Sequence, residues 1–161
     1  MKFYIRQQPF SWSERFCVRD EAERDVLAAE GELFSLGAKL HVFDLSGKEI
    51  GFIHQQLLGW RPRYRVEING RQVGFVVRRF ALVGSRFDFD GLGWVAEGSF
   101  GSHDFTVYDQ ERVVMTVRKA WFSWGDSYEL DIRAKEEIVP AICLLLAIDL
   151  ALALDSKSSD D

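Results

Sequence analysis

The stretch that decides the fold is Ile138-Val139-Pro140-Ala141-Ile142-Cys143-Leu144-Leu145-Leu146-Ala147-Ile148-Asp149-Leu150-Ala151-Leu152-Ala153-Leu154. Its composition favours a helix, and apolar side chains occupy every face of that helix. Such a helix must be surrounded by lipid or by protein. A bilayer span needs about 20 apolar residues, and a central Asp149 is costly inside a membrane. The segment therefore predicts a helix over 137–154 that is enclosed by the rest of the protein.

The chain before this helix has the pattern of an antiparallel sheet. Twelve alternating or β-rich runs are separated by turn residues, and they cover 2–8, 15–20, 26–31, 39–44, 49–56, 63–68, 71–79, 85–90, 94–98, 104–109, 112–119 and 127–133. Asn69-Gly70 is the strongest hairpin signal, because a type I′ turn needs positive φ at both positions. The sequence therefore predicts a single all-β domain over residues 1–155. We expect a closed twelve-stranded antiparallel β-barrel that encloses the hydrophobic C-terminal helix, followed by a polar tail at 156–161.

Composition excludes several classes of protein. With 161 residues, 47% of them hydrophobic, the chain can bury a core and is not disordered over most of its length. Two cysteines, Cys17 and Cys143, cannot form a disulfide scaffold. The N-terminus lacks the apolar run of a signal peptide, so we expect a cytoplasmic protein, with a peripheral place at a membrane left open.

An internal repeat supports a barrel. Segments starting at Ile5, Ile53 and Val117 align without gaps, and each contains a strand, a short link with a tryptophan and a return strand. Repetition of a β unit is typical of closed barrels.

These features resemble the LURP-one-related proteins and their bacterial YxjI-like members. The resemblance covers Lys2 to Leu154 and rests on Phe-Ser-Trp-Ser-Glu-Arg-Phe-Cys-Val (10–18), Ala-Glu-Gly-Glu-Leu-Phe-Ser-Leu-Gly-Ala-Lys-Leu-His-Val-Phe-Asp-Leu-Ser-Gly (29–47), the stretch from Tyr64 to Gly70 and the apolar C-terminal helix. It implies the fold of tubby C-terminal domains and phospholipid scramblases, a twelve-stranded barrel around an apolar helix. It also brings in phosphoinositides, which tubby domains bind, as a ligand class. The cysteine-rich stretch of scramblases is missing here, which argues against phospholipid scrambling.

Reactive side chains are scarce. Ser102-His103-Asp104 is not a catalytic triad, because neighbours in a strand point to opposite faces, and we interpret these residues as a turn leading into a strand. The three histidines and two cysteines have no metal-ligand spacing, so we expect no metal and no cofactor. Asp149 needs a hydrogen-bond partner inside the barrel, such as an inward arginine, or exposure at the rim. An enzyme that uses Asp149 or a histidine at the barrel mouth stays a lesser alternative.

Charge gives the clearest functional signal. The net charge of −5 divides into a basic first half and a strongly acidic second half, and the basic excess gathers in 54–86. A two-residue turn at Asn69-Gly70 would place Arg61 opposite Arg78. That register predicts a shared outer face for Arg61, Arg63, Arg65 and Arg78, with Tyr64, Val66, Val73, Phe75 and Val77 pointing inward. Such opposed like charges need an anionic partner, either the acidic C-terminal half or an external phosphate.

The leading hypothesis is a non-catalytic binding module. We expect it to engage anionic phospholipid headgroups or a protein partner through the arginine-rich hairpin, with Arg61, Arg63, Arg65, Arg78 and Arg79 as candidate ligand-binding residues. A structural or regulatory domain that acts as a homo-oligomer is the alternative. Nucleic acid is disfavoured, since the chain is acidic overall.

Overall fold

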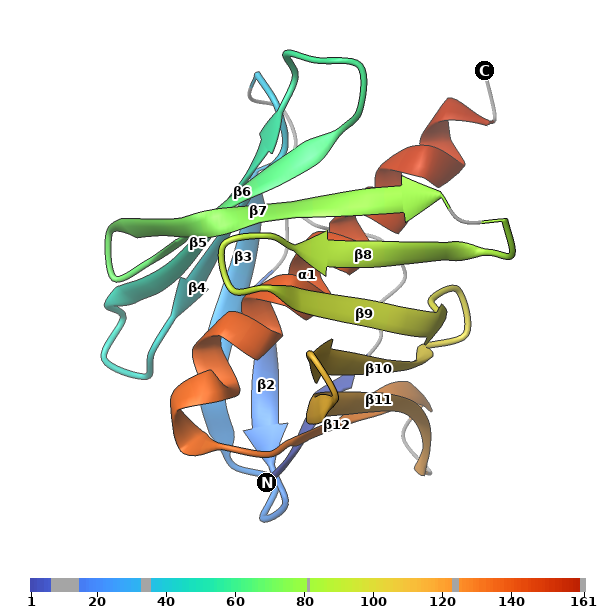
Figure 1. Cartoon of the computed structure of the whole chain (residues 1–161). Coiled ribbons are helices and arrows are strands. Elements are labelled where there is room, and N and C mark those ends of the chain that lie inside the picture. The colour runs from blue at the N-terminus through green and yellow to red at the C-terminus, as the bar shows by residue number, and fades with distance from the viewer. Residues whose placement is uncertain (7–14, 33–35, 81, 123–124, 160–161) are drawn as a thin grey trace.

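Twelve β-strands, a short 3₁₀-helix and one α-helix follow one another in the computed structural model (Figure 1). The structure describes residues 1–6, 15–32, 36–80, 82–122 and 125–159. The strands are β1 (Lys2–Arg6), β2 (Phe16–Asp20), β3 (Asp25–Glu32), β4 (Lys39–Phe43), β5 (Glu49–Gln56), β6 (Arg63–Ile68), β7 (Arg71–Phe80), β8 (Ser85–Phe89), β9 (Trp94–Ser99), β10 (Asp104–Asp109), β11 (Arg112–Phe122) and β12 (Gly125–Ile132). The helices are η1 (Lys135–Glu137) and α1 (Ile138–Ser158). Each predicted run coincides with a strand, and the predicted positions 7–8 lie outside the described residues.

The sheet closes on itself. Each strand pairs antiparallel with its neighbours in sequence, and β1 pairs with β12. The predicted closed twelve-stranded barrel is therefore confirmed. Because consecutive strands are antiparallel, the links that follow odd-numbered strands gather at one end of the barrel, and those that follow even-numbered strands gather at the other (Figure 1).

We name these two ends by their links. The loop end comprises the described links 36–38, 57–62, 82–84 and 100–103. The turn end comprises the links 21–24, 44–48, 69–70, 90–93 and 110–111. In Figure 1 the loop end lies toward the top and right, and the turn end toward the bottom and left.

The hairpin between β6 and β7 has the predicted turn. Asn69 and Gly70 have φ values of 50° and 77°, and Ile68 pairs with Arg71. Both central residues are thus in the left-handed region that a type I′ turn requires.

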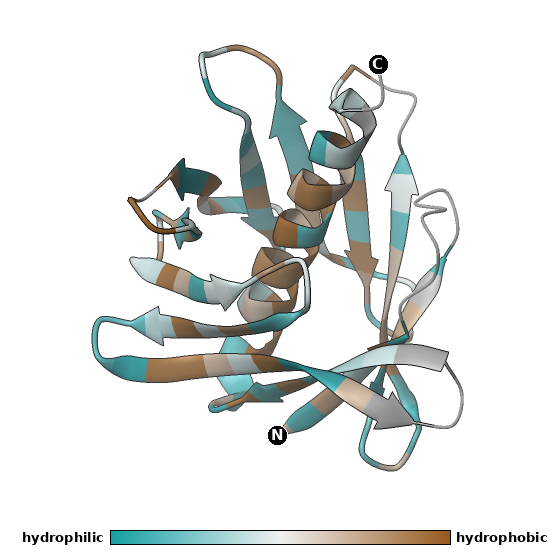
Figure 2. Cartoon of the chain, turned by 90° about the vertical axis from the view of Figure 1, so that its right-hand side faces the viewer, coloured by the Kyte–Doolittle hydropathy of each residue, from teal (hydrophilic) through white to brown (hydrophobic). Residues whose placement is uncertain are grey.

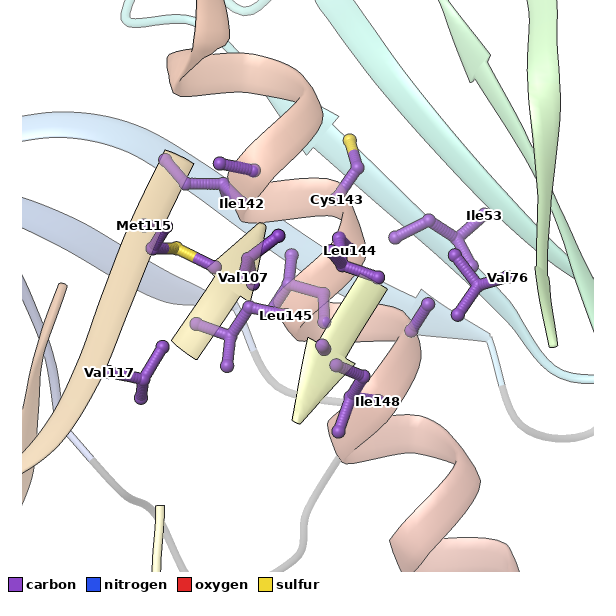
Figure 3. Packing of buried hydrophobic residues seen from close by; sticks show 14 of the residues in the cluster. Ile53, Val76, Val107, Met115, Val117, Ile142, Cys143, Leu144, Leu145 and Ile148 are labelled. Atoms are coloured by element: carbon purple, nitrogen blue, oxygen red, sulfur yellow. The ribbon is translucent and has the colours of Figure 1, made fainter. Parts of the chain in front are cut away.

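Helix α1 fills the barrel from the turn end to the loop end. Every residue from Ala141 to Leu150 is buried, and the helix contacts strand side chains on opposite sides. Figure 3 shows Leu145 near Val107 on one side, and Leu144 near Val76 on the other. By length and composition the helix could cross a membrane, but 67% of its apolar window is buried inside the protein. The barrel wall thus supplies the apolar surroundings that the sequence demanded (Figure 2).

The helix continues one turn beyond its predicted end at 154. Its last turn contains Asp155, Ser156 and Ser158, so part of the predicted polar tail is helical. The hydroxyl of Ser156 donates to the carbonyl oxygen of Ala153 at 2.8 Å, and that of Ser158 donates to the carbonyl oxygen of Asp155 at 2.8 Å. These bonds satisfy serine side chains without breaking the helix.

The internal repeat corresponds to three hairpins of the barrel wall. They are β1–β2, β5–β6 and β11–β12. Equivalent positions face the core and are buried: Ile5, Ile53 and Val117 in the first strand, and Val18, Val66 and Leu130 in the second. The repeat therefore records the same inward pattern at three places around the wall.

Candidate functional site

The arginines of β6 lie where the sequence predicts them. Tyr64 and Val66 are buried on the inner face, while Arg63 is exposed and Arg65 half-buried on the outer face. Arg61 precedes the strand and lies exposed in the 57–62 link of the loop end. Arg79 of β7 is also exposed, so four of the five candidate side chains belong to the outer surface or the rim.

The predicted register of β7 is wrong beyond its first residues. A bulge shifts the pairing, so that Glu67 pairs with Gln72 but Val66 pairs with Gly74. Beyond a one-residue bulge every side chain points to the opposite face from the one counted from the turn. Arg63 consequently pairs with Val77, and Arg61 does not face Arg78.

The bulge depends on Gly74. Its φ is 153°, and a Cβ there would lie 2.6 Å from the backbone nitrogen of Gly91 in the β8–β9 turn. Only glycine fits this close approach. The shift places Val76 in the core cluster and turns Phe75 and Val77, which the sequence had placed inward, to the opposite face. Val73 precedes the shift and lies partly buried against the cluster, in agreement with its predicted inward position. Phe75 instead faces outward, and the guanidinium of Arg63 lies 4.4 Å from the centre of its ring.

Arg78 is turned toward the inside of the barrel at the loop end. Its Nη1 donates to Oδ2 of Asp155 in the last turn of α1, and its guanidinium lies 5.7 Å from the ring centre of buried Phe87. Burial and the nearby Asp155 raise the pKa of Tyr64 to about 12, against the opposing charge of Arg78. The partner of Arg78 is therefore the acidic C-terminal segment, one of the two partners that the sequence left open.

Other arginines of the segment also have acidic partners. Arg65 Nη2 lies 3.7 Å from Glu67 Oε2, and Arg79 and Arg86 each place Nε 3.1 Å from an oxygen of Asp88. Within the described parts of the chain, Arg61 and Arg63 have no carboxylate within 4.0 Å. Among the described residues, two positive charges that are two positions apart in sequence thus lie at the loop end without a carboxylate partner.

The loop end also carries large apolar side chains in full contact with solvent. The residues and their exposed fractions are Leu36 90%, Leu57 58%, Leu58 90%, Trp60 104%, Phe80 72%, Leu82 108% and Val83 93%. The sequence patterns did not predict this apolar surface. The local signal was Leu57-Leu58-Gly-Trp60, an apolar run placed in a link between strands instead of in a strand.

Asp149 is the one strongly polar residue within the apolar part of α1. Tyr128 Oη donates to its Oδ2 at 2.6 Å, and His103 Nε2 lies 3.1 Å from its Oδ1. The rings of Tyr128 and His103 stack with their centres 4.4 Å apart. Burial, and then the charge of Asp149, raise the pKa of Tyr128 well above its ordinary value. Asp149 therefore has hydrogen-bond partners inside the barrel, as predicted, and they are a tyrosine and a histidine.

The geometry around residues 102–104 supports the interpretation of that stretch as a turn. His103 has φ 51° and precedes β10, and its ring contacts Asp149. The Ser102 hydroxyl instead donates to Ser99 Oγ at 2.6 Å. Serine, histidine and aspartate are thus not aligned as a nucleophile, a base and its orienting acid.

The remaining polar features do not bring metal ligands together. Among the described residues, no group of three or more His, Cys, Asp and Glu side chains could hold a metal ion. A hollow of about 310 Å³ lies on the outer wall, and Glu49, Glu67, His41 and Phe52 line it. His41 Nδ1 lies 2.7 Å from Glu49 Oε1. Its acidic lining makes this hollow unsuited to an anion.

A closed twelve-stranded antiparallel barrel built around a C-terminal helix is the fold that the resemblance to tubby C-terminal domains implied. The LURP-one-related family model matches residues 1–149. The chain belongs to the LURP-one-related family.

One protein sequence and one solved structure are similar to this chain. The uncharacterized protein YxjI of Bacillus subtilis is 33% identical over 159 residues, which are 99% of this chain and 98% of that protein. The crystal structure of an Arabidopsis thaliana protein superposes with a TM-score of 0.65 at 14% identity, over 93% of this chain and 90% of that one. The second likeness shows the shared fold.

Proposed function

We propose that this chain is a non-catalytic binding module whose loop end engages anionic phospholipid headgroups through Arg61 and Arg63. The observation that carries the proposal is the pair of exposed guanidinium groups without a carboxylate partner in the described parts of the chain. The chain is acidic overall, with 25 Asp and Glu against 20 Lys and Arg. Within the part of the chain that the structure describes, no carboxylate lies within 4.0 Å of these two arginines. Uncompensated positive charge in an acidic protein is a site for an external anion.

Phosphate is the anion that arginine suits best. The planar guanidinium offers paired N–H donors that match two oxygens of a phosphate. Near an anionic membrane surface each basic side chain contributes about 1 kcal/mol of binding free energy. Two such residues give weak, reversible attachment that other contacts at the same end must reinforce.

The five candidate arginines divide by their partners. Arg61 and Arg63 have no carboxylate partner among the described residues, which leaves their donors for a ligand. Arg65 and Arg79 have carboxylate partners at the surface, at 3.7 Å and 3.1 Å, so an incoming phosphate must compete with an acid. Arg78 is bound to Asp155 and supports the end of the helix. We therefore assign the main contribution to Arg61 and Arg63.

The test compares the flotation of variants with vesicles. The protein is mixed with vesicles of phosphatidylcholine alone, or of phosphatidylcholine with phosphatidylserine. We expect recovery with the anionic vesicles only, and about a fivefold loss of partition for each of Arg61→Gln and Arg63→Gln. Arg71→Gln is the matched control, because Arg71 is exposed at the turn end and lacks an acidic partner among the described residues.

Two results would overturn the proposal. One is equal recovery with and without anionic lipid. The other is an Arg61→Gln/Arg63→Gln variant that partitions as the wild type does. If the chain ignores both kinds of vesicle and forms a dimer at rising concentration, the alternative of a homo-oligomeric interaction domain replaces the lipid-binding module.

A further inference from the structure

Exposed apolar side chains are segregated to one end of the barrel. Seven of the nine large hydrophobic residues exposed in the described chain lie in or beside links of the loop end. The other two are Met1 and Leu45, and Leu45 lies in a link of the turn end. The links of the turn end are otherwise polar or glycine-rich. The two ends therefore present chemically different surfaces.

The apolar residues sit at the tips of separate links. The β5–β6 link carries Leu57, Leu58 and Trp60, and the β7–β8 link carries Leu82 and Val83. Figure 1 shows both links projecting beyond the barrel, and Figure 2 shows hydrophobic colour at the tip of the β5–β6 link, at the top of the view. Large exposed apolar groups mark surfaces that contact a protein or a membrane. Projecting tips can insert into a lipid layer, whereas a flat protein surface would contact only their ends.

The positive charge of the arginines beside these tips favours an anionic bilayer over a second copy of the chain. Arg61 directly follows Trp60 in the same link, and Arg63 begins β6 two residues later. A second copy of this chain would bring the same arginines against each other, which is unfavourable. An anionic bilayer offers phosphates at the level of the arginines and acyl chains below them. Tryptophan is enriched at that boundary, since its ring is apolar and its N–H is polar.

We propose that the loop end penetrates the interfacial layer of an anionic bilayer with Leu57, Leu58, Trp60, Leu82 and Val83. Arg61 and Arg63 then lie at the level of the phosphates. This inference rests on the proposed function and adds how deeply the loop end enters the bilayer and how the barrel is oriented on it. Because α1 runs from the turn end to the loop end, the barrel stands with the C-terminal end of its helix facing the lipid. Asp155, the acid of that helix end, is neutralised by Arg78, which lowers its repulsion from anionic lipid.

The experiment measures the depth of Trp60. Vesicles of phosphatidylcholine and phosphatidylserine are prepared with brominated acyl chains, which quench tryptophan that enters the hydrocarbon boundary. The difference between the emission of wild type and Trp60→Phe isolates Trp60 from the other four tryptophans. We expect quenching of the Trp60 component on anionic vesicles and none on neutral ones.

A pair of variants tests the other tips. Leu58→Ser and Leu82→Ser each weaken partition about tenfold, because each removes apolar area from the buried contact. Leu45→Ser at the turn end is the matched control and leaves partition unchanged. Wild type that binds anionic vesicles with Trp60 unquenched, or with both serine variants unaffected, overturns penetration while headgroup binding stands. Wild type that binds neither vesicle overturns the proposed function and penetration together.

Discussion

Replacing Tyr128 by phenylalanine removes one hydroxyl group from the interior of the barrel. The phenol donates to Oδ2 of Asp149 at 2.6 Å, and the two residues are only 4% and 9% exposed. Phenylalanine keeps the ring that stacks on His103 at 4.4 Å. The change therefore isolates the loss of one hydrogen bond to a buried carboxylate. A hydrogen bond to a charged group contributes about 1.5–3 kcal/mol, so we expect a loss of that size in the free energy of unfolding.

Urea unfolding followed by circular dichroism measures this loss. With a slope near 2 kcal/mol per molar urea, the midpoint falls by about 1 M while the slope is unchanged. Tyr108→Phe is the matched control, because Tyr108 is half-buried and its hydroxyl has no partner among the described residues. In an Asp149→Asn background the same Tyr128→Phe change costs less, since the carboxylate charge is gone. A loss below about 0.5 kcal/mol, or an equal loss in both backgrounds, would refute the role given to the Tyr128–Asp149 bond.

Three further perturbations test the fold. Gly74→Ala places a Cβ 2.6 Å from the backbone nitrogen of Gly91, and we expect a loss of about 2–4 kcal/mol in the free energy of unfolding by the same urea assay. Leu145→Ala leaves a cavity between α1 and the barrel wall and costs about 2–5 kcal/mol, visible as a lower melting temperature. Burial raises the pKa of the Cys143 thiol from 9.0 to about 12. Above pH 9 the thiol ionises in the unfolded chain but stays protonated in the folded one. The free energy of unfolding is therefore unaffected by this group below pH 9 and decreases as the pH rises from 9 toward 12. Cys143→Ala therefore flattens this alkaline loss in a pH series of unfolding curves, and an unchanged slope would contradict the burial of the thiol.

Local signals in the sequence were enough for the architecture. The apolar run ending at Leu154 must be surrounded by lipid or by protein, and the repeat of one β unit at three places favours a closed barrel as that surrounding. Asn69-Gly70 predicts one hairpin, because these two residue types readily adopt the positive φ values that a type I′ turn requires. Each of these features is set by neighbours in sequence or by the polarity of one segment.

The details of the candidate site depend on distant residues. The bulge at Gly74 follows from the approach of Gly91 on another hairpin, so counting from the turn gives the wrong face for Arg78. The partner of Arg78, Asp155, lies 77 residues away. The residue pattern within a single strand does not predict such a long-range contact. A glycine inside a predicted strand was the available hint, because it is a usual mark of a bulge.

The partners of Asp149 follow the same logic. The need for a partner could be predicted from the position of a carboxylate on an apolar helix. Their identities could not, because Tyr128 and His103 lie 21 and 46 residues away in sequence. The exposed tips of the loop end differ, since Leu58 and Trp60 are visible in the sequence. That these links lie together at one end of the barrel can be known only from the order of the strands in the sheet.

Hydroxyl-radical footprinting of the wild-type chain tests most directly which end of the barrel meets a membrane. Oxidation of Leu58, Trp60 and Leu82 is compared with that of Leu45, in buffer and on vesicles that contain phosphatidylserine. We predict that the vesicles protect the three residues of the loop end and leave Leu45 as reactive as in buffer. Protection of Leu45 with the loop end still reactive, or the same reactivity everywhere with bound vesicles, would contradict docking through the loop end.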